Sequence, residues 1–181
     1  MVVKILGLDI SSTCIGWGLL LIDNENKISY INSGVLKPPK ADDIIERIVK
    51  TRDMLISIIK ECNPDEIAIE DIVQFMSGKS TAKTIITLTT FNRMVCLLSR
   101  DLLQKSPKLY NVMTIRHGLK KNKLLPKKED MPNLVSEHLG FTFNYELNRR
   151  GNNKPENYDR ADGIAVALYH AFVITNKLKK K

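Results

Sequence analysis

Residues 4–13 read KILGLDISST, an apolar run with one carboxylate, Asp9, at its centre. The run predicts a short strand that is covered on both of its faces. A charge inside a buried strand is costly unless it is paired or binds a metal ion. The polar turn 11–13 then leads into a second apolar run. Asp9 is therefore the first candidate site residue, and the rest of the chain must supply its partner.

The pattern that follows predicts a mixed α/β sheet. After the first strand, further strands are expected at residues 16–22, 28–35, 66–71 and 112–115. The polar turn 23–26 joins two of them, so the chain opens with an antiparallel meander. A helix capped by Asp42 or Asp43 should run to about Cys62, because its apolar residues recur every three or four positions. Strand, helix and strand after a meander add parallel strands to the same sheet.

Later helices are expected at residues 83–103, 127–139 and 158–177. The second of these follows Pro126 and ends at Gly140. The helix at 83–103 has an apolar arc well beyond the ~100° stripe of a surface helix. Such a helix is either central to the core or buried a second time by another subunit. The polar strip left on it holds Thr89, Asn92, Arg93, Cys96, Ser99 and Arg100.

The length and composition predict one globular domain over residues 1–181, with 43% hydrophobic residues. No segment is long enough to span a bilayer, and no signal-peptide pattern follows Met1, so a cytoplasmic protein is expected. Cys14, Cys62 and Cys96 are odd in number and lack metal-binding spacing, which predicts reduced thiols. No membrane partner and no organic cofactor are expected.

The net charge of +8 and the isoelectric point near 9.4 favour a polyanionic partner. The basic segment 105–128 lies in a window, residues 102–128, that contains no acid. A window of this kind favours contact with phosphates over a solvated surface. Lysines also fill the C-terminal tail 177–181. The candidate nucleic-acid-binding cations are Lys79, Arg116, Lys120, Lys121, Lys123, Arg149 and Arg150.

Three more acids occur in apolar settings like that of Asp9. Glu70 lies near the end of the expected strand 66–71, and Asp159 and Asp162 open the last helix. Because residues three apart share a helix face, the last two carboxylates point the same way. Each acid alone has a simpler explanation: a buried hydrogen-bonded group, a solvated strand end, or acids that complement a helix dipole.

Taken together, the four acids predict a metal site. Carboxylates brought into one cleft repel one another unless cations neutralise them. Oxygen ligands suit Mg²⁺ or Mn²⁺, whereas zinc usually binds histidine or cysteine. Two such ions can activate a water and stabilise a leaving 3′ oxygen in phosphodiester hydrolysis. The basic surface would then hold a nucleic acid over the metals.

Three segments in order carry a resemblance to a known family. They are LGLD at 6–9 with the following hydroxyl turn and GWG at 16–18, IAIE at 67–70, and DRADGIAVA at 159–167. Over roughly residues 5–171 the chain resembles RuvC-type Holliday junction resolvases of the ribonuclease H-like superfamily, in a form often seen in phages. The resemblance implies a ribonuclease H-like five-stranded sheet flanked by helices. It also implies, for a phage-encoded chain, a location in the host cytoplasm.

The resemblance assigns roles to individual residues. Asp9, Glu70, Asp159 and Asp162 become catalytic ligands of two Mg²⁺ ions per site, with Mn²⁺ as a substitute. Lys127 or Lys128 matches a basic residue near the scissile phosphate, and Phe75 matches an aromatic residue at the junction crossover, although packing is an equal explanation. The helix at 83–103 matches the element that pairs two subunits. The partner is then branched double-stranded DNA, cut as a four-way junction by paired symmetric nicks.

Some features depart from the family pattern. Ile10-Ser11 replaces the usual Pro-Gly after the first acid. Asp71 lies beside Glu70, where it could support the metal ligands or, as strand alternation predicts, point to the other face. His117, His138 and His170 have no ligand spacing and are expected to be structural or, for His117, to contact phosphate.

Three other functions are alternatives to junction resolution. A broader debranching nuclease would act on Y-forks, flaps and other branched DNA with the same site. A junction-binding protein without turnover is less compatible with four intact acids. An actin-like ATPase or sugar kinase also opens with an early Asp and small hydroxyl residues, but needs two such domains and more than 181 residues.

Overall fold

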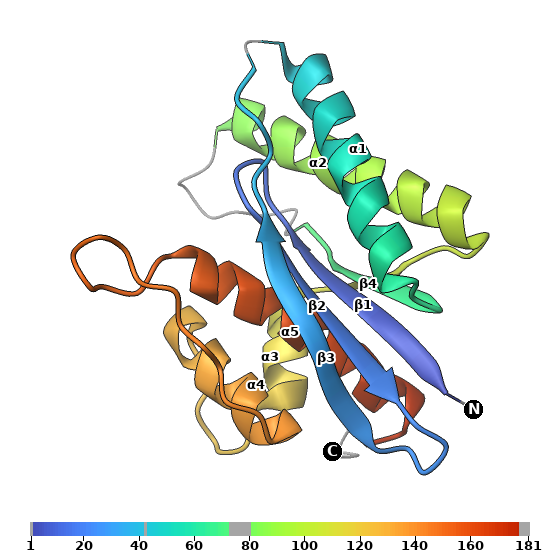
Figure 1. Ribbon diagram of the computed structural model, residues 1–181, viewed down its shortest axis with the longest axis vertical. Coiled ribbons are helices and arrows are strands. Elements are labelled where there is room, and N and C mark those ends of the chain that lie inside the picture. The colour runs from blue at the N-terminus through green and yellow to red at the C-terminus, as the bar shows by residue number, and fades with distance from the viewer. Residues whose placement is uncertain (1, 42, 73–80, 178–181) are drawn as a thin grey trace.

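The computed structural model describes residues 2–41, 43–72 and 81–177 (Figure 1). The elements in chain order are β1 Val3–Ile10, β2 Ile15–Ile22, β3 Ile28–Leu36, α1 Ile44–Cys62, β4 Glu66–Glu70, α2 Ala82–Leu103, β5 Lys108–Tyr110, α3 Val112–Leu119, the 3-10 helix η1 Lys128–Asp130, α4 Met131–Leu139 and α5 Glu156–Ile174.

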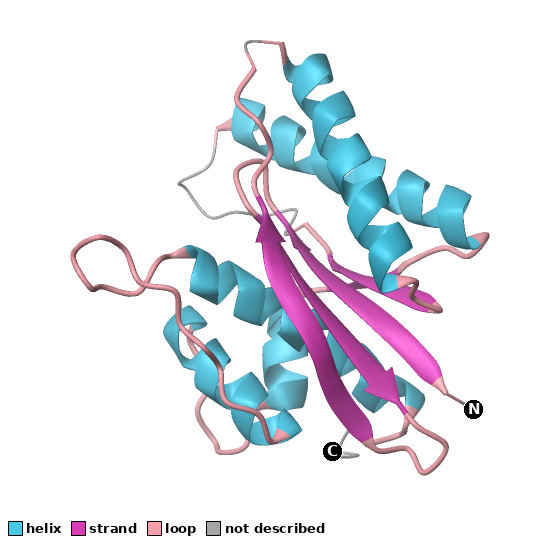
Figure 2. Cartoon of the chain, viewed as in Figure 1, coloured by secondary structure: helices cyan, strands magenta, loops and turns pink. Residues whose placement is uncertain are grey.

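The strands form one five-stranded sheet in the order β3-β2-β1-β4-β5. Strands β1, β2 and β3 pair antiparallel, whereas β4 and β5 continue from β1 in parallel. Figure 2 shows the strands between two groups of helices. One core packs α3, α4 and α5 on the sheet, and the other packs α1 and α2 on its opposite face. The expected mixed five-stranded sheet flanked by helices is confirmed.

β1 is the central strand, and it is buried on both faces. Ile5 faces the α5 side, whereas Leu6 and Leu8 face α1 and α2, as strand alternation requires. Gly7 shares the α5 side, where a Cβ atom would lie 2.3 Å from the backbone nitrogen of Ala167. Helix α5 therefore lies directly on the sheet, which explains why its middle is built from small and apolar residues.

The expected strand at 112–115 is wrong. Residues 112–119 form α3, whose N-terminus is capped by the Asn111 side chain, which accepts a hydrogen bond of 2.8 Å from Met113 N. The strand of this region is β5, which lies earlier and pairs in parallel with β4. A four-residue apolar run fits a strand or one helical turn equally well, and only the cap distinguishes them.

Other boundaries differ less. Asp43 caps α1 as expected, while Asp42 lies outside the described residues. The helix expected at 127–139 is split into η1 and α4, and Gly140 ends it in the left-handed conformation, with φ +66°. Cys14 and Cys62 are buried free thiols. No helix among the described residues is long and apolar enough to cross a membrane.

Helix α2 leaves part of its apolar arc uncovered. Ile86 and Leu97 are 65% and 67% exposed. Two members of its polar strip, Asn92 and Ser99, are buried instead, and Asn92 Nδ2 donates a hydrogen bond of 2.9 Å to the carbonyl oxygen of Glu70. The helix therefore buries Asn92 at the sheet end that carries Glu70, while Ile86 and Leu97 point to solvent.

Candidate active site

Two of the expected acids are brought together by strand pairing. Asp9 lies near the end of β1 and Glu70 ends β4, and the two parallel strands pair with Leu8 opposite Ile69. Alternation turns both carboxylates to the sheet face that α5 covers. Asp71, the next residue, points the other way and pairs with Arg93 of α2, N–O 3.2 Å. Of the two expectations for Asp71, this contact favours the one in which it faces away from the site.

Helix α5 supplies the other two acids from its N-terminal turns. Asp162 is buried, whereas Asp159 is partly exposed. Asp162 is one of the charges that act on both Asp9 and Glu70. The structure therefore brings all four sequence-predicted acids into one electrostatic cluster, built from two strand ends and one helix start.

The electrostatics of this cluster disfavour the ionised acids. Burial and then the neighbouring charge of Glu70 raise the pKa of Asp9 well above its usual range. Burial and then Asp162 raise the pKa of Glu70 to about 7. Burial raises the pKa of Asp162 to about 6, against the lowering effect of Lys128 and Arg116. Like charges in a poorly solvated site call for a cation.

Lys128 provides one cation. Its Nζ donates to Oδ1 of Asp159 over 2.6 Å and lies 3.7 Å from Oδ2 of Asp162. The pKa of Lys128 is raised above its usual value, because these contacts outweigh the opposing effect of burial. The neighbouring Lys127 is exposed, and its backbone N–H is used to cap η1 through Asp130. The sequence does not distinguish Lys127 from Lys128 as the basic residue of the site, and these contacts favour Lys128.

Two more residues approach the acids. Arg116 of α3 lowers the pKa of both Glu70 and Asp162, and its Nε is buried without a hydrogen-bond acceptor among the described residues. The sequence placed Arg116 on the DNA-binding surface rather than beside the acids. Cys14 also lies near the acids and was not predicted as a site residue. Burial, and then the Asp159 carboxylate, raise the pKa of its thiol to about 12. Its position in the β1–β2 turn, two residues before Gly16, was the only indication in the sequence that it lies near the site.

The donor set fits a hard divalent cation. All four acids offer oxygen ligands, and burial with mutual repulsion disfavours their ionised forms. Within residues 2–41, 43–72 and 81–177, no three acidic, histidine or cysteine side chains stand in a ready-made metal-binding group. The Lys128 ammonium group instead contacts Asp159 and Asp162, where a divalent ion would compete with it.

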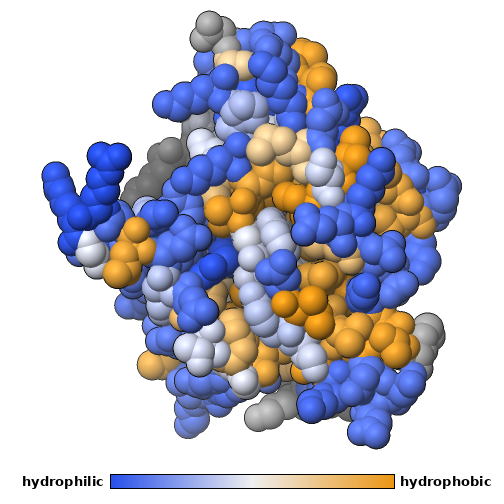
Figure 3. All heavy atoms as spheres, viewed as in Figure 1, coloured by the Kyte–Doolittle hydropathy of each residue, from blue (hydrophilic) through white to orange (hydrophobic). Residues whose placement is uncertain are grey.

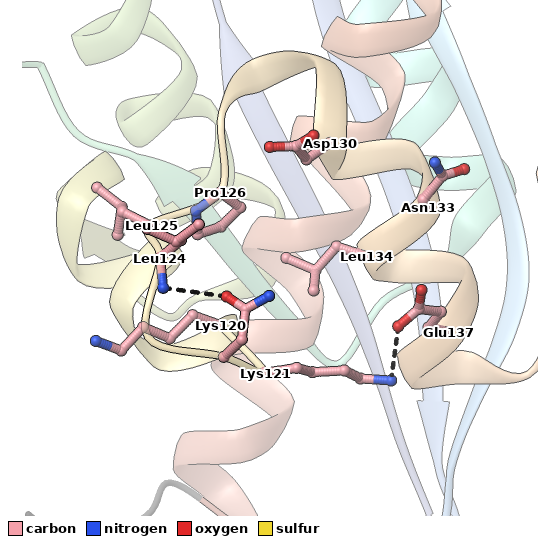
Figure 4. A pocket seen from close by; sticks show the side chains of 10 residues that line it. Lys120, Lys121, Leu124, Leu125, Pro126, Asp130, Asn133, Leu134 and Glu137 are labelled. Atoms are coloured by element: carbon pink, nitrogen blue, oxygen red, sulfur yellow. Dashed lines mark hydrogen bonds and ion pairs between the residues drawn. The ribbon is translucent and has the colours of Figure 1, made fainter.

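The predicted DNA-binding cations are distributed over two loops. Lys120, Lys121 and Lys123 follow α3, where the loop and α4 enclose a groove of about 380 Å³ (Figure 4). Lys121 reaches across it to Glu137, N–O 3.2 Å, while Lys123 is exposed. The exposed pair at 149–150 lies in the loop before α5. Phe75 and Lys79 lie outside the described residues.

The histidines do not join the acids. His170 is buried, with Nδ1 2.8 Å from the Tyr110 hydroxyl and Nε2 2.7 Å from Glu66 Oε2. His138 Nε2 lies 2.7 Å from the carbonyl oxygen of Leu119. Their expected structural role is consistent with these contacts. His117 is exposed on α3.

Comparison with known proteins adds an independent view. The family model for the crossover junction endodeoxyribonuclease RuvC matches residues 5–123. A protein of that name from Paramagnetospirillum magneticum is 35% identical over 81 residues, or 44% of this chain and 48% of that protein. The chain thus spans about half the length of that relative. The Fusobacterium nucleatum protein is 26% identical over 97% of this chain and 83% of its own length.

Solved structures give the same fold. The RuvC of T. thermophilus in complex with a Holliday junction substrate superposes with a TM-score of 0.70, at 18% identity and 96% coverage of both chains. The yeast mitochondrial Holliday junction resolvase Ydc2 gives a TM-score of 0.62 at 15% identity, covering 92% of this chain and 77% of that chain.

Proposed function

Because this chain belongs to the RuvC family of crossover junction endodeoxyribonucleases, we propose that it is a metal-dependent endonuclease that resolves four-way DNA junctions by paired symmetric nicks. The observation that carries this proposal is the cluster of Asp9, Glu70 and Asp162, whose charges act on one another, with Lys128 joining Asp162 to Asp159. We further propose that residues 1–181 form one nuclease domain, since β1 near one end of the chain packs on α5 near the other. The proposed location is the cytoplasm, of the host if a phage encodes the chain.

The four acids would hold two Mg²⁺ ions, with Mn²⁺ as a substitute. When bound, such a pair supplies an activated water and stabilises the leaving 3′ oxygen. Asp9 is suited to be a ligand of both ions, because the charges of all three other acids raise its pKa. Glu70 would complete the cluster from the strand side, and Asp159 and Asp162 from the helix side.

Lys128 would stabilise the charge that develops on the phosphate. Its ammonium group already lies at the edge of the cluster, and its side chain is 45% exposed, so it is accessible to a strand laid over the acids. A fixed positive group aimed at developing charge acts strongly where water is excluded. Arg116 would partly offset the raised pKa of Glu70 and Asp162, since its charge lowers the pKa of both.

The substrate would lie along the basic loops. Lys120 and Lys123 in the loop after α3, together with the exposed arginines in the loop before α5, offer cations from two segments of the chain. Phosphate contacts of this kind fix the register of a nucleic acid without reading its sequence.

We propose a homodimer through α2. Ile86 and Leu97 are exposed there, and α1 adds Ile45, 61% exposed, on the same face of the sheet. A groove of about 530 Å³ between the two helices is lined by Ile44 and Ile86. Figure 3 shows apolar surface on this end of the molecule. Two copies joined there would present two acid clusters, as paired nicking requires.

The experiment that tests the function uses a synthetic four-way junction labelled on each strand in turn. With Mg²⁺ the wild-type protein should give symmetric nicks and ligatable duplexes, and Asp9→Asn should give none. Equal nicking by both proteins would reject the assignment. Y-forks and flaps in the same assay test the broader debranching activity: cleavage of these at rates equal to the junction would favour it.

A further inference from the structure

The loop before α5 forms an ordered projection, residues 146–154, which we name the finger. Its two sides are joined by a bridge between Leu147 and Asn153. The Asn148 side-chain oxygen accepts hydrogen bonds of 2.8 and 3.1 Å from two backbone amides of the tip. Gly151, at φ +78°, closes the turn and donates its N–H to the Asn148 carbonyl oxygen over 3.0 Å. The finger is therefore held in one shape by its own backbone.

The tip of the finger carries two cations. Arg149 and Arg150 are both exposed, and the finger's single acid, Glu146, is paired with Lys154 at the base, N–O 2.9 Å. Figure 1 shows the finger extending away from the body of the molecule beside the start of α5, and Figure 3 shows a hydrophilic tip there. Exposed guanidinium groups on a rigid turn suit bidentate contact with phosphates.

The base of the finger is fixed to the helix turn that carries the acids. Asn157 is buried, its Oδ1 accepts from Glu146 N over 2.9 Å, and its Nδ2 donates to the carbonyl oxygens of Glu146 and Lys154 over 2.8 and 3.0 Å. Arg160 lies over the Phe143 ring, 4.3 Å from its centroid. Asn157 and Arg160 lie two residues before and one residue after Asp159 in α5, so the finger base contacts the helix turn that bears this acid.

We propose that the finger holds one duplex arm of the branched DNA by its phosphates, and that Asn157 fixes this grip relative to the acid cluster and so sets which phosphate is cut. This inference rests on the proposed nuclease function. The physical reason is preorganisation: a rigid finger loses little conformational entropy on binding, and a rigid base transmits its position to the acids. Asn157 is thus a positioning residue.

Binding tests the grip separately from cleavage. In the Asp9→Asn background, the double variant Arg149→Ala/Arg150→Ala should weaken junction binding and reduce the slope of log affinity against log salt by about 2, at about 0.9 per phosphate contact. The matched control is Arg52→Ala/Lys60→Ala, which removes two exposed cations from α1 on the opposite face of the sheet. Equal salt slopes for the two double variants would overturn the inference.

Strand-resolved mapping tests the positioning. Asn157→Ala should spread the nicks over phosphates adjacent to the wild-type position and keep the wild-type salt slope, since both arginines remain. A second variant with two glycines inserted between Arg150 and Gly151 covers the case in which Asn157→Ala fails a thermal melting check. Nicks at the wild-type phosphate in the folded variants would overturn the inference. A wild-type protein that cuts no branched DNA would instead reject the proposed function, while the binding test still decides the grip.

Discussion

A Cβ atom added to Gly16 would lie 1.8 Å from the backbone oxygen of Asp159. Gly16 is also the β2 partner of Asp9 in the antiparallel pair. The helix turn that bears Asp159 therefore packs directly on the β2 backbone at Gly16, next to Asp9. The acid cluster depends on this contact, because any side chain at position 16 would push the start of α5 away from β1.

Gly16→Ala should destabilise the protein and abolish nicking. The clash is with backbone atoms, which cannot move aside, so overpacking should cost about 3 kcal/mol or more and lower the melting temperature by at least about 6 °C. Gly140→Ala is the control: its Cβ would meet open space, and only its φ of +66° opposes it, at about 1 kcal/mol. Full activity of the folded Gly16→Ala protein would contradict the dependence of the acid cluster on this contact.

In the metal-free protein, the contribution of Glu70 and Asp162 to stability should fall as the pH rises from about 4.5 to about 7. The pKa of Glu70 is raised from 4.5 to about 7 and that of Asp162 from 3.8 to about 6 in the folded chain. In this range the folded state keeps protons that the unfolded state has released, so raising the pH favours unfolding. Urea unfolding in EDTA at several pH values measures the change.

Two variants and a metal titration sharpen this test. Glu70→Gln should flatten the pH dependence, whereas Glu25→Gln in the exposed β2–β3 turn should leave it unchanged. Mg²⁺ at about pH 8 should raise the melting temperature of the wild type more than that of Glu70→Gln, because a ligand stabilises the state it binds. A pH dependence in EDTA that is the same for Glu70→Gln as for the wild type would contradict the assignment.

Lys128→Ala should lower kcat by about 10²- to 10³-fold with little loss of junction affinity, since a group aimed at developing charge acts mainly in the transition state. Lys128→Arg should recover part of this activity. Lys127→Ala separates the two lysines, because Lys127 is exposed while Lys128 contacts Asp159. A larger loss of kcat in Lys127→Ala than in Lys128→Ala would reverse the assignment.

The acids were accessible to sequence reasoning because their positions follow from local rules. Strand alternation turns Asp9 and Glu70 to one sheet face, and helix periodicity turns Asp159 and Asp162 to one helix face. The same rules predict four of the five strands, but they place the fifth at residues 112–115, which form α3, instead of at β5. That run is short, and its Asn111 cap is a side-chain contact that periodicity does not report.

The remaining site residues depend on tertiary contacts. Lys127 and Lys128 are equivalent in the sequence, and only the 3-10 helix η1 turns one of them to the acids. In the sequence Arg116 is one of several cations in the basic segment, and nothing there indicates that its charge acts on Glu70. Asn157 precedes the helix expected at 158–177, and its burial becomes evident only when the finger base is in place.

The proposed subunit contact on α2 should depend on Leu97. Leu97 is 67% exposed on α2, and burying such a side chain contributes about 2 kcal/mol, twice in a two-fold symmetric interface. Leu97→Glu should therefore convert a wild-type dimer to a monomer in analytical ultracentrifugation. It should also replace paired nicks with single nicks, because each monomer holds one acid cluster. Ile31→Glu, on β3 and 47% exposed, is the matched control and should stay dimeric. Dissociation of the control, or a dimeric Leu97→Glu protein with paired nicks, would place the subunit contact elsewhere than α2.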